Sequence, residues 1–335
     1  MTEAIKEFNT VLQDFKIKAT CIDYQQTENY FYYDLSLNPA TKIRDISKFS
    51  DEISLALKTF GKPIIKVIHN DGIVRLEFLS KRKKVLNLFD YFNNDNVPNG
   101  EINCLLGQKA DGQPLWMDLA QNPHMIVAGT TGSGKSVLLH NIIANLFNYN
   151  DIDLFLIDPK KIEFSEYKNR CSRCTVFNSF SDSMDLFGSL IELMEFRYDL
   201  IATGSSISSL KPVVIIVDEF ADLIMQDRDN KFYTILCSLA QKCRAARIHI
   251  ILSTQRPSVN FINGAIKANF PARIACRVAS HIDSKVVLDS KGAEDLLGNG
   301  DALLRDSSRF LDRFQIAYTS HKEVCDFFGD KNVIS

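Results

Sequence analysis

The stretch from Asn122 to Phe147, NPHMIVAGTTGSGKSVLLHNIIANLF, limits the possible folds of this chain more than any other feature. A short apolar run from His124 to Ala128 precedes a loop of glycine, threonine and serine, and apolar residues at helical spacing follow the loop. The loop matches the pattern G-x-x-x-x-G-K-[ST], in which Lys135 and Ser136 occupy the last two positions. The sequence therefore predicts a phosphate-binding loop between a buried strand and a helix.

Each position of this loop has a role in holding phosphate. Glycines let the backbone pass close to the ligand, so that its N–H groups form a nest at the positive end of the helix. Lys135 can reach the β- and γ-phosphates, and the Ser136 hydroxyl is placed to ligate magnesium. A glycine-rich turn that matches by chance is the alternative, and the flanking strand and helix argue against it. The expected cofactors are ATP and Mg²⁺, bound by Gly129, Thr130, Thr131, Gly132, Ser133, Gly134, Lys135, Ser136 and Val137.

A phosphate loop needs a carboxylate on a neighbouring strand, and two apolar runs end in one. DLFLIDPK places Asp158 at its end, and VVIIVDEF places Asp218 there. We prefer the second because Glu219 follows directly, so that one carboxylate can hold the metal while the other deprotonates the attacking water. A solvated strand end is the alternative. The expected metal ligands are Ser136 and Asp218, and the expected general base is Glu219.

A third polar element follows the run HIILSTQRP. Thr254 and Gln255 stand at its end, where the ligands of open α/β sheets bind. We expect Gln255 to sense the γ-phosphate, although polar pairs are common at strand ends.

The pattern of elements predicts two domains. Residues 1–98 read as a small α+β unit, with strands YFYYDL, PIIKVIH and IVRLEFL and one amphipathic helix over residues 45–61. The polar break NNDNVPNGE marks the boundary. Residues 99–335 alternate strands with helices, which predicts an α/β fold with a mostly parallel sheet covered on both faces.

Composition indicates the cellular compartment of the protein rather than its chemistry. The chain has 335 residues, a formal net charge of -2 and eight cysteines without regular spacing. With no run of eighteen apolar residues and no signal pattern, we expect a cytoplasmic protein with reduced thiols. Cys171 and Cys174 form a C-x-x-C pair, which we interpret as two thiols rather than half of a zinc site. The near-neutral charge does not indicate a nucleic-acid-binding surface, although a protein that grips DNA inside a channel can have it.

Several segments together resemble the motor domain of the FtsK/SpoIIIE family of DNA translocases over Leu105 to Leu304. The resemblance implies a RecA-like P-loop ATPase that assembles as a hexameric ring and pulls double-stranded DNA through its centre. The segment before residue 99 is more loosely similar to the small α domain of that family. The matching segments are GTTGSGKSVLLHNIIANL, LIDPKKIEFSEY, VVIIVDEFADLI, LAQKCRAARIHIILSTQRPSVNFINGAIKANFPARIA and SHIDSKVVLDSKGAEDLLGNGDALL.

The resemblance also implies roles for residues outside the phosphate loop. Arg244 matches an arginine that reaches across the subunit interface to the γ-phosphate of a neighbour. Arg256, Lys267 and Lys285 match basic residues that face DNA in the channel. His281 departs from the family, which usually has lysine there, so the ring would carry less fixed positive charge toward DNA at this position. Ordinary solvated surface charge is the alternative for each of these residues.

The expected protein is a bare motor, because the printed chain continues into neither a winged-helix module nor a membrane anchor. We expect it to serve a phage, a plasmid or an integrated element, with a recruiting partner that the sequence does not identify. Related ATPase domains power type VII protein secretion, which is the main alternative function. A nucleotide-binding regulator without turnover is disfavoured by the intact pair Asp218 and Glu219.

Overall fold

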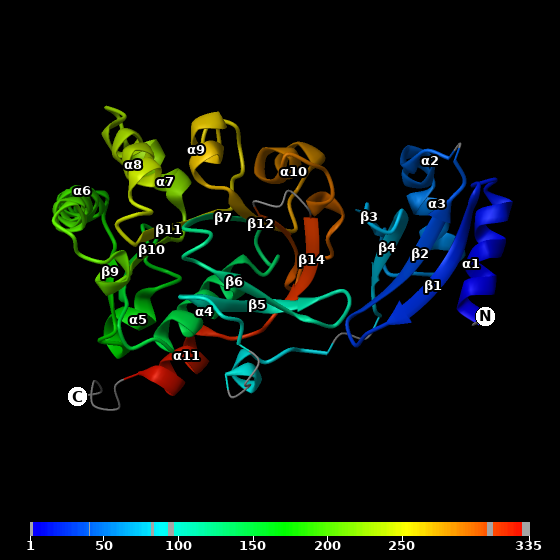
Figure 1. Ribbon diagram of the computed structural model, residues 1–335, viewed down its shortest axis with the longest axis horizontal. Helices are drawn as coiled ribbons and strands as arrows, with labels where there is room; N and C mark the ends of the chain where they lie inside the picture. Colours follow the sequence, from blue (N-terminus) through cyan, green and yellow to red (C-terminus); the bar gives the residue numbers. More distant parts are fainter. Residues whose placement is uncertain (1–2, 40, 82–83, 93–96, 307–310, 330–335) are drawn as a thin grey trace.

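Two sheets of different size organise the chain (Figure 1). The structure is a computed structural model that describes residues 3–39, 41–81, 84–92, 97–306 and 311–329. The smaller, four-stranded sheet has the order β1-β2-β4-β3, and all of its neighbouring strands are antiparallel. Its elements are α1 Glu3–Asp14, β1 Ala19–Gln26, β2 Tyr30–Leu37, α2 Ile43–Lys48, α3 Ser50–Ala56, β3 Ile64–Ile68 and β4 Ile73–Leu79.

Short helices pack on one face of this small sheet. Phe8 and Leu12 of α1 lie in one buried cluster with Ile46 and Ile53 of α2 and α3. The single helix expected over residues 45–61 is therefore wrong. The chain breaks at Phe49, whose φ of -101° and ψ of 17° are not helical, and the resulting short helices leave Phe60 exposed.

The larger sheet has ten strands in the order β6-β5-β14-β13-β12-β7-β11-β10-β8-β9. The six strands from β12 to β9 are parallel, and an antiparallel group of four closes the other side. Its strands are β5 Asn103–Lys109, β6 Pro114–Asp118, β7 His124–Ala128, β8 Asp153–Ile157, β9 Cys174–Phe177, β10 Val213–Val217, β11 Ile248–Thr254, β12 Ala272–Cys276, β13 Asp301–Arg305 and β14 Leu311–Ile316.

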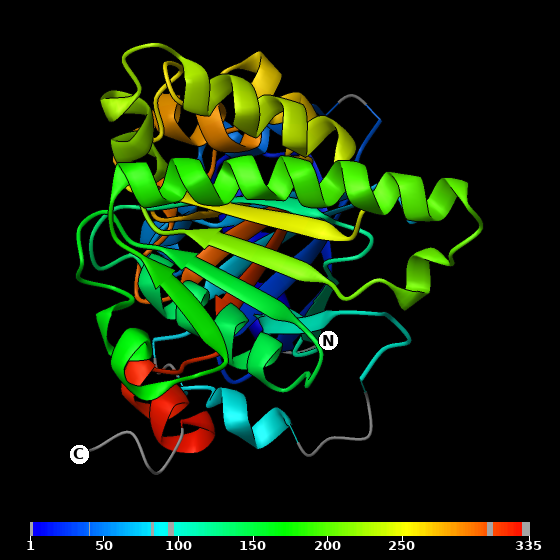
Figure 2. The same cartoon turned by 90° about the vertical axis from the view of Figure 1, so that its left-hand side faces the viewer.

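Helices cover both faces of this sheet (Figures 1 and 2), so the mostly parallel α/β arrangement expected from the sequence is confirmed. One face carries α4 Lys135–Phe147, α5 Ser165–Arg170 and α11 His321–Phe328. The other face carries α6 Phe180–Ala202, α7 Phe220–Gln226, α8 Lys231–Lys242, α9 Gly264–Asn269 and α10 His281–Leu288. Short 3-10 turns complete the chain at η1 Leu88–Tyr91, η2 Ile207–Ser209 and η3 Ala293–Asp295.

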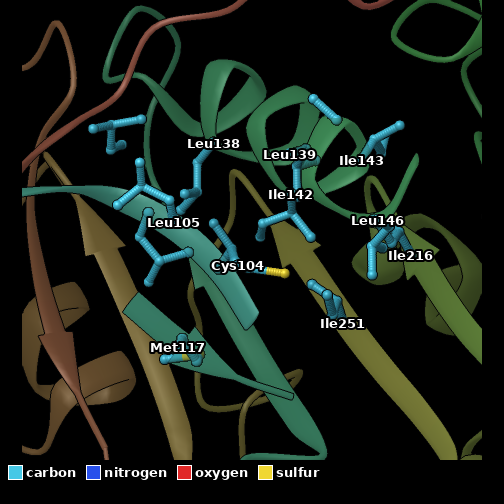
Figure 3. Close-up of a cluster of buried hydrophobic side chains, with 14 of the residues drawn as sticks. Cys104, Leu105, Met117, Leu138, Leu139, Ile142, Ile143, Leu146, Ile216 and Ile251 are labelled. Atoms are coloured by element: carbon cyan, nitrogen blue, oxygen red, sulfur yellow. The ribbon is translucent and has the colours of Figure 1, made fainter. Parts of the chain in front are cut away.

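The β-strands are apolar on both faces because each face is buried under helices. Val214 and Ile216 of β10 point to the α4 side, whereas Val213, Ile215 and Val217 point to the α6 side. Leu138, Leu139, Ile142, Ile143 and Leu146 of α4 pack against β5, β10 and β11, as Figure 3 shows. This packing fixes the position of α4, and therefore also the position of the loop that leads into it.

The register of the parallel strands brings four strand ends together. Thr254 of β11 pairs with Ala128 of β7, and Val217 of β10 pairs with both Leu252 of β11 and Ile157 of β8. The residues that follow these strands therefore share one edge of the sheet, where ligands of open α/β sheets bind.

A buried ion pair of the larger sheet is hydrogen-bonded to the smaller sheet. Arg313 donates two hydrogen bonds to Asp301, at 2.9 and 2.8 Å, and a third to the backbone oxygen of Glu77 at 2.8 Å. The Tyr30 hydroxyl also donates to Asp301, at 3.3 Å. Burial raises the pKa of the Glu77 carboxyl to about 7, although Lys66, Arg313 and Arg75 oppose the shift.

Candidate functional site

The glycine-rich loop lies at the carboxyl end of β7 and is packed against the loop before β13. Gly134 has a φ of 108°, and a Cβ on it would lie 2.7 Å from Gly300 Cα, so both conformation and space require glycine there. Gly300 donates its N–H to Ser133 O at 2.9 Å, and Asn299 donates to Gly132 O at 3.2 Å. The second loop thus holds the first in its curved conformation.

A cavity of about 530 Å³ opens above this loop. Its size is within the usual range for small-molecule sites. The first amides of α4 have no acceptor within the helix and lie at its positive end, which suits an anion. The cavity is lined by Thr130, Thr131, Gly132, Gly134, Lys135, Ser136, Val137, Glu163 and Gln255, and also by Lys84, Val85, Leu86, Asn299, Gly300, Gln315, Ile316 and Tyr318.

Lys135 and Asp218 form a buried ion pair at the base of the cavity. Lys135 Nζ lies 2.7 Å from Asp218 Oδ1 and 2.8 Å from Ser253 Oγ. Burial raises the pKa of Asp218, an effect that the positive Lys135 opposes. The structure therefore brings together the lysine of the loop and the carboxylate that we preferred on sequence grounds.

Ser136 is tied to a carboxylate that the sequence analysis did not select. Its hydroxyl donates a hydrogen bond to Glu163 Oε1 at 2.8 Å, and His140 Nε2 lies 3.7 Å from Glu163 Oε2. Tyr167 OH holds the other ring nitrogen of His140 at 3.0 Å. Contacts from His140 and Ser136, together with Lys135, lower the pKa of Glu163 to about 2 despite its partial burial. Glu163 is therefore a fixed anion beside the serine.

Glu219 is held by the end of β11. Its Oε1 accepts a hydrogen bond from Thr254 Oγ1 at 2.5 Å, and its Oε2 accepts one from Gln255 N at 2.9 Å. Lys160 Nζ lies 3.6 Å from the same Oε2. The Thr254 hydroxyl in turn accepts the N–H of Arg256 at 2.9 Å. One threonine thus connects Glu219 with the segment that carries Arg256.

Asp158, the other carboxylate considered from the sequence, stabilises a loop beside the site. It is fully buried, and its Oδ2 accepts the N–H of Phe164 at 2.9 Å. This bond folds the 159–163 loop back, so that Lys160 and Glu163 reach the site. Their only sequence signal is their position directly after a strand that ends at the same edge, in the segment LIDPKKIEF.

Arg244 lies at the opposite edge of the sheet from Lys135. It is exposed, follows α8, and precedes β11, whose other end is at the phosphate loop. It lines a separate cavity of about 460 Å³ with Glu101, Tyr198 and His249. A strand of this length separates the two edges by roughly 15–20 Å. Arg244 is therefore remote from the phosphate loop of its own chain.

The four basic residues expected at DNA lie on different elements and in different environments: Arg256 follows β11, Lys267 is on α9, and His281 and Lys285 are on α10. Arg256, His281 and Lys285 are exposed, and the described residues provide no ion-pair partner for Arg256 or Lys285. Lys267 differs, because its Nζ lies 2.8 Å from Asp289 Oδ1 and 3.4 Å from the backbone oxygen of Lys285. Lys267 thus joins α9 to α10, which lie side by side in Figure 1.

Known proteins match this chain in sequence and in fold. A family model described as the FtsK/SpoIIIE family matches residues 93–209 and 200–259. The DNA translocase FtsK of Haemophilus influenzae is 32% identical over 98% of this chain and 70% of its own length. The chain belongs to the FtsK/SpoIIIE family. The DNA translocase FtsK of Chlamydia trachomatis is also 32% identical, over 100% of this chain but only 47% of its own length, so the chain spans about half of that relative.

Solved structures support the same FtsK-like P-loop fold. The conjugation coupling protein TcpA of pCW3, in a monomer form with ATPγS, has a TM-score of 0.66 and 22% identity, with 95% of each chain covered. The cytoplasmic domain of the type VII secretion ATPase EccC of Thermomonospora curvata has a TM-score of 0.63 and 21% identity over 74% of this chain and 35% of its own. No helix within the described ranges has the length and apolar character needed to cross a membrane.

Proposed function

We propose that this FtsK/SpoIIIE-type ATPase hydrolyses ATP to move double-stranded DNA through a hexameric ring. Lys135, Ser136 and Gln255 line one cavity, and the buried carboxylates of Asp218 and Glu219 lie behind it, bonded to Lys135 and to the Gln255 N–H. This arrangement carries the proposal, in a chain that is 32% identical, over nearly its whole length, to proteins named DNA translocases. Binding of ATP by the loop, and its hydrolysis, are the first elements of the proposal.

The loop would hold the phosphates of ATP, and Lys135 would exchange its contact with Asp218 for the β- and γ-oxygens. Glu219 would accept the proton of the attacking water, since it is the carboxylate next to Asp218 at the strand end. Gln255 lines the cavity and touches Thr131 through a 3.3 Å hydrogen bond, so its amide is placed to contact the γ-phosphate. These groups are assigned the roles expected from the sequence.

The donor set fits a magnesium ion bound with the nucleotide. The Ser136 hydroxyl directs its proton to Glu163, which leaves its oxygen lone pairs available for a hard cation. Asp218 supplies a carboxylate directly after β10, which β11 separates from β7. Such an ion would neutralise the charge that develops on the phosphates.

Arg244 and the basic residues of the DNA prediction extend the proposal beyond one chain. Because Arg244 lies far from its own phosphate loop, we assign it to the site of a neighbouring copy in the ring. Arg256, His281 and Lys285 are assigned to DNA phosphates, and Lys267 stabilises the end of α10 through its ion pair with Asp289. Sequence-independent binding follows, because phosphate contacts carry no base information.

Protein secretion is the second candidate, since the fold is also that of a type VII secretion ATPase. A steady-state ATPase assay separates the two. We expect turnover to rise several-fold on adding long duplex DNA, to be abolished by Lys135→Ala, and to fall by about 100-fold or more in Glu219→Gln while ATP binding persists. A turnover that DNA leaves unchanged would contradict DNA translocation and favour secretion. Full turnover by Lys135→Ala would contradict the assignment of the site.

A further inference from the structure

Arg244 lies in a turn, residues 243–247, between α8 and β11. The backbone of this turn closes on itself, because Ala246 donates its N–H to Cys243 O and Arg247 donates its N–H to Arg244 O, both at 3.1 Å. Arg244 is exposed, and its side chain has neither a hydrogen bond nor an ion pair with the residues that the structure describes. The turn therefore presents one unengaged guanidinium on an ordered backbone.

Two adjacent side chains of α6 hold the two ends of this turn. The Tyr198 hydroxyl donates a hydrogen bond to Lys242 O at 2.6 Å, and Arg197 Nη1 donates one to Ala246 O at 2.6 Å. Lys242 and Ala246 lie two residues before and two residues after Arg244. Since α6 is a helix of 23 residues that crosses the sheet as the long green helix of Figure 2, the base for both contacts is rigid.

The contact made by Arg197 is unusual for a structural residue. Arg197 is buried, and no carboxylate lies at ion-pair distance from it within the described ranges. Its guanidinium donates only to backbone oxygens, to Ala246 and, at 2.8 Å, to Lys211, and burial lowers its pKa. Burying a charge without an opposite charge is unfavourable, and an apolar side chain would fill this space without that penalty. A need to hold the turn in one place accounts for the arginine.

Arg247 fixes the end of the turn from another side. Its φ of 53° lies in the left-handed region, which residues other than glycine seldom adopt. Its Nη1 donates to Ser208 O at 2.7 Å and to Leu210 O at 2.9 Å, and its Nη2 donates to Glu101 Oε2 at 2.9 Å. Backbone strain of this kind persists where the surroundings determine the conformation, and it is concentrated at functional sites.

We propose that Arg197 and Tyr198 are positioning residues for Arg244, which they hold where its guanidinium reaches the nucleotide of a neighbouring copy. The proposal rests on the proposed action of Arg244 in trans and adds two residues to it. Stabilisation of a transition state depends on where a charge lies, so a displaced arginine slows the reaction. Loss of either contact therefore lowers turnover at the neighbouring site and leaves ATP binding by the altered chain unchanged.

Steady-state kinetics of Tyr198→Phe test this role, because the substitution removes only the hydroxyl that bonds Lys242 O. We expect kcat to fall by about 5- to 100-fold, since a displacement of ~1 Å at a catalytic group can cost about 100-fold. The Kd for ATPγS, the melting temperature and the oligomeric state should match those of the wild type. Tyr233→Phe is the matched control and should keep the wild-type kcat, because its hydroxyl bonds Asn263 near the start of α8.

A mixing experiment distinguishes positioning of Arg244 from a defect in the altered chain's own site. In rings that combine Tyr198→Phe with an excess of Lys135→Ala, a chain that can hydrolyse ATP receives Arg244 on an intact turn from its neighbour. Turnover per Tyr198→Phe chain should therefore rise several-fold relative to wild type diluted in the same proportion. Arg197→Met, which removes the other contact, should be rescued in the same way.

The outcomes separate this proposal from the one on which it rests. An unchanged kcat in Tyr198→Phe overturns the proposal, and so does a loss of ATPγS affinity. A loss of turnover that Lys135→Ala chains do not relieve, in rings shown to be mixed, assigns the residue to its own site or to stability and also overturns it. Full turnover by Arg244→Ala would instead contradict the action of Arg244 in trans.

Discussion

The hydroxyl of Ser136 donates its proton to Glu163 rather than to Asp218, across 2.8 Å. Asp218 is engaged with Lys135 instead, so the two carboxylates at this edge have separate partners. A partner of this kind orients the lone pairs of a metal-binding hydroxyl and raises its affinity for the cation.

Removal of Glu163 should therefore weaken magnesium binding more than nucleotide binding. In Glu163→Ala we expect the Mg²⁺ concentration at half-saturation of ATPγS binding to rise by about 10- to 100-fold, with nucleotide affinity in EDTA nearly unchanged. Glu163→Gln keeps an acceptor for Ser136 and should give an intermediate value. Glu166→Ala is the control, since that carboxylate contacts His321 and Arg170 outside the cavity. An unchanged Mg²⁺ requirement in Glu163→Ala would refute this role.

Thr254 should couple DNA to hydrolysis, because its hydroxyl bonds both Glu219 and the backbone of Arg256. In Thr254→Val both bonds are lost while the size of the side chain is kept. We expect hydrolysis without DNA to rise and the ratio of DNA-stimulated to basal turnover to fall by several-fold. Thr254→Ser keeps both bonds and should preserve the ratio. If Thr254→Val stimulates as the wild type does, the threonine does not transmit the DNA signal.

Arg244 should act on a neighbouring chain rather than its own. Arg244→Ala alone should bind ATPγS normally and hydrolyse ATP at least about 100-fold more slowly. Mixing Arg244→Ala with Lys135→Ala, each inactive alone, should restore part of the activity, because some sites then combine an intact loop with an intact arginine. Arg228→Ala, an exposed arginine beyond α7, is a control that should retain activity. The absence of recovery in rings shown by native mass spectrometry to be mixed would exclude action in trans.

Arg256 and Lys285 should differ from Lys267 in DNA binding. Neutralising either of the first two should reduce the slope of log affinity against log salt by about one unit on any duplex sequence. Lys267→Ala should change the slope less but lower the melting temperature, because it removes the partner of Asp289 in a cluster that also contains Arg273. Fluorescence anisotropy over a salt series measures the first effect and thermal unfolding the second. Equal slopes for wild type and Arg256→Ala would remove Arg256 from the DNA surface.

Glu77 should make stability depend on pH. Its folded pKa of about 7 exceeds the ordinary value of 4.5, so the folded state binds more protons between those values. Stability should therefore fall as pH rises from about 4.5 to 7 and stay lower above that range. Glu77→Gln removes this pH-dependent contribution to stability, so the melting temperature of the variant should exceed that of the wild type at pH 8 and approach it at pH 5. A constant difference across this range would show that Glu77 is not the titrating group.

The parts of the site that the sequence predicted are those fixed by a single strand end or a single helix start. Lys135 and Ser136 open α4, and Asp218 and Glu219 follow β10, so local pattern alone places them at the edge of the sheet. Glu163 and Lys160 were not predicted, because they reach the site only through a loop that folds back on Asp158. The bridge between Asn87 and Tyr318 was not predicted because the two residues are far apart in the sequence and pair only in the folded chain.

Other features of the structure also depend on details that the sequence pattern does not contain. The helix over residues 45–61 was expected from apolar spacing, but spacing does not exclude a break at one residue such as Phe49. The DNA contact expected for Lys267 stays a prediction, whereas its ion pair with Asp289 lies between two different elements and could not be identified from the motif. Periodicity identified the elements well, whereas contacts between distant elements required the structure.

The pairing of β5 with β14 has a consequence for how the protein is made. Lys109 lies opposite Phe314, and Gly300 supports the phosphate loop from the same late part of the chain. On the ribosome, the small sheet can form while the rest is still being synthesised, but the cradle for ATP lacks its back wall until residues near 316 have emerged. A nucleotide can therefore bind in this cavity only after residues near 316 have been synthesised and have folded against the loop.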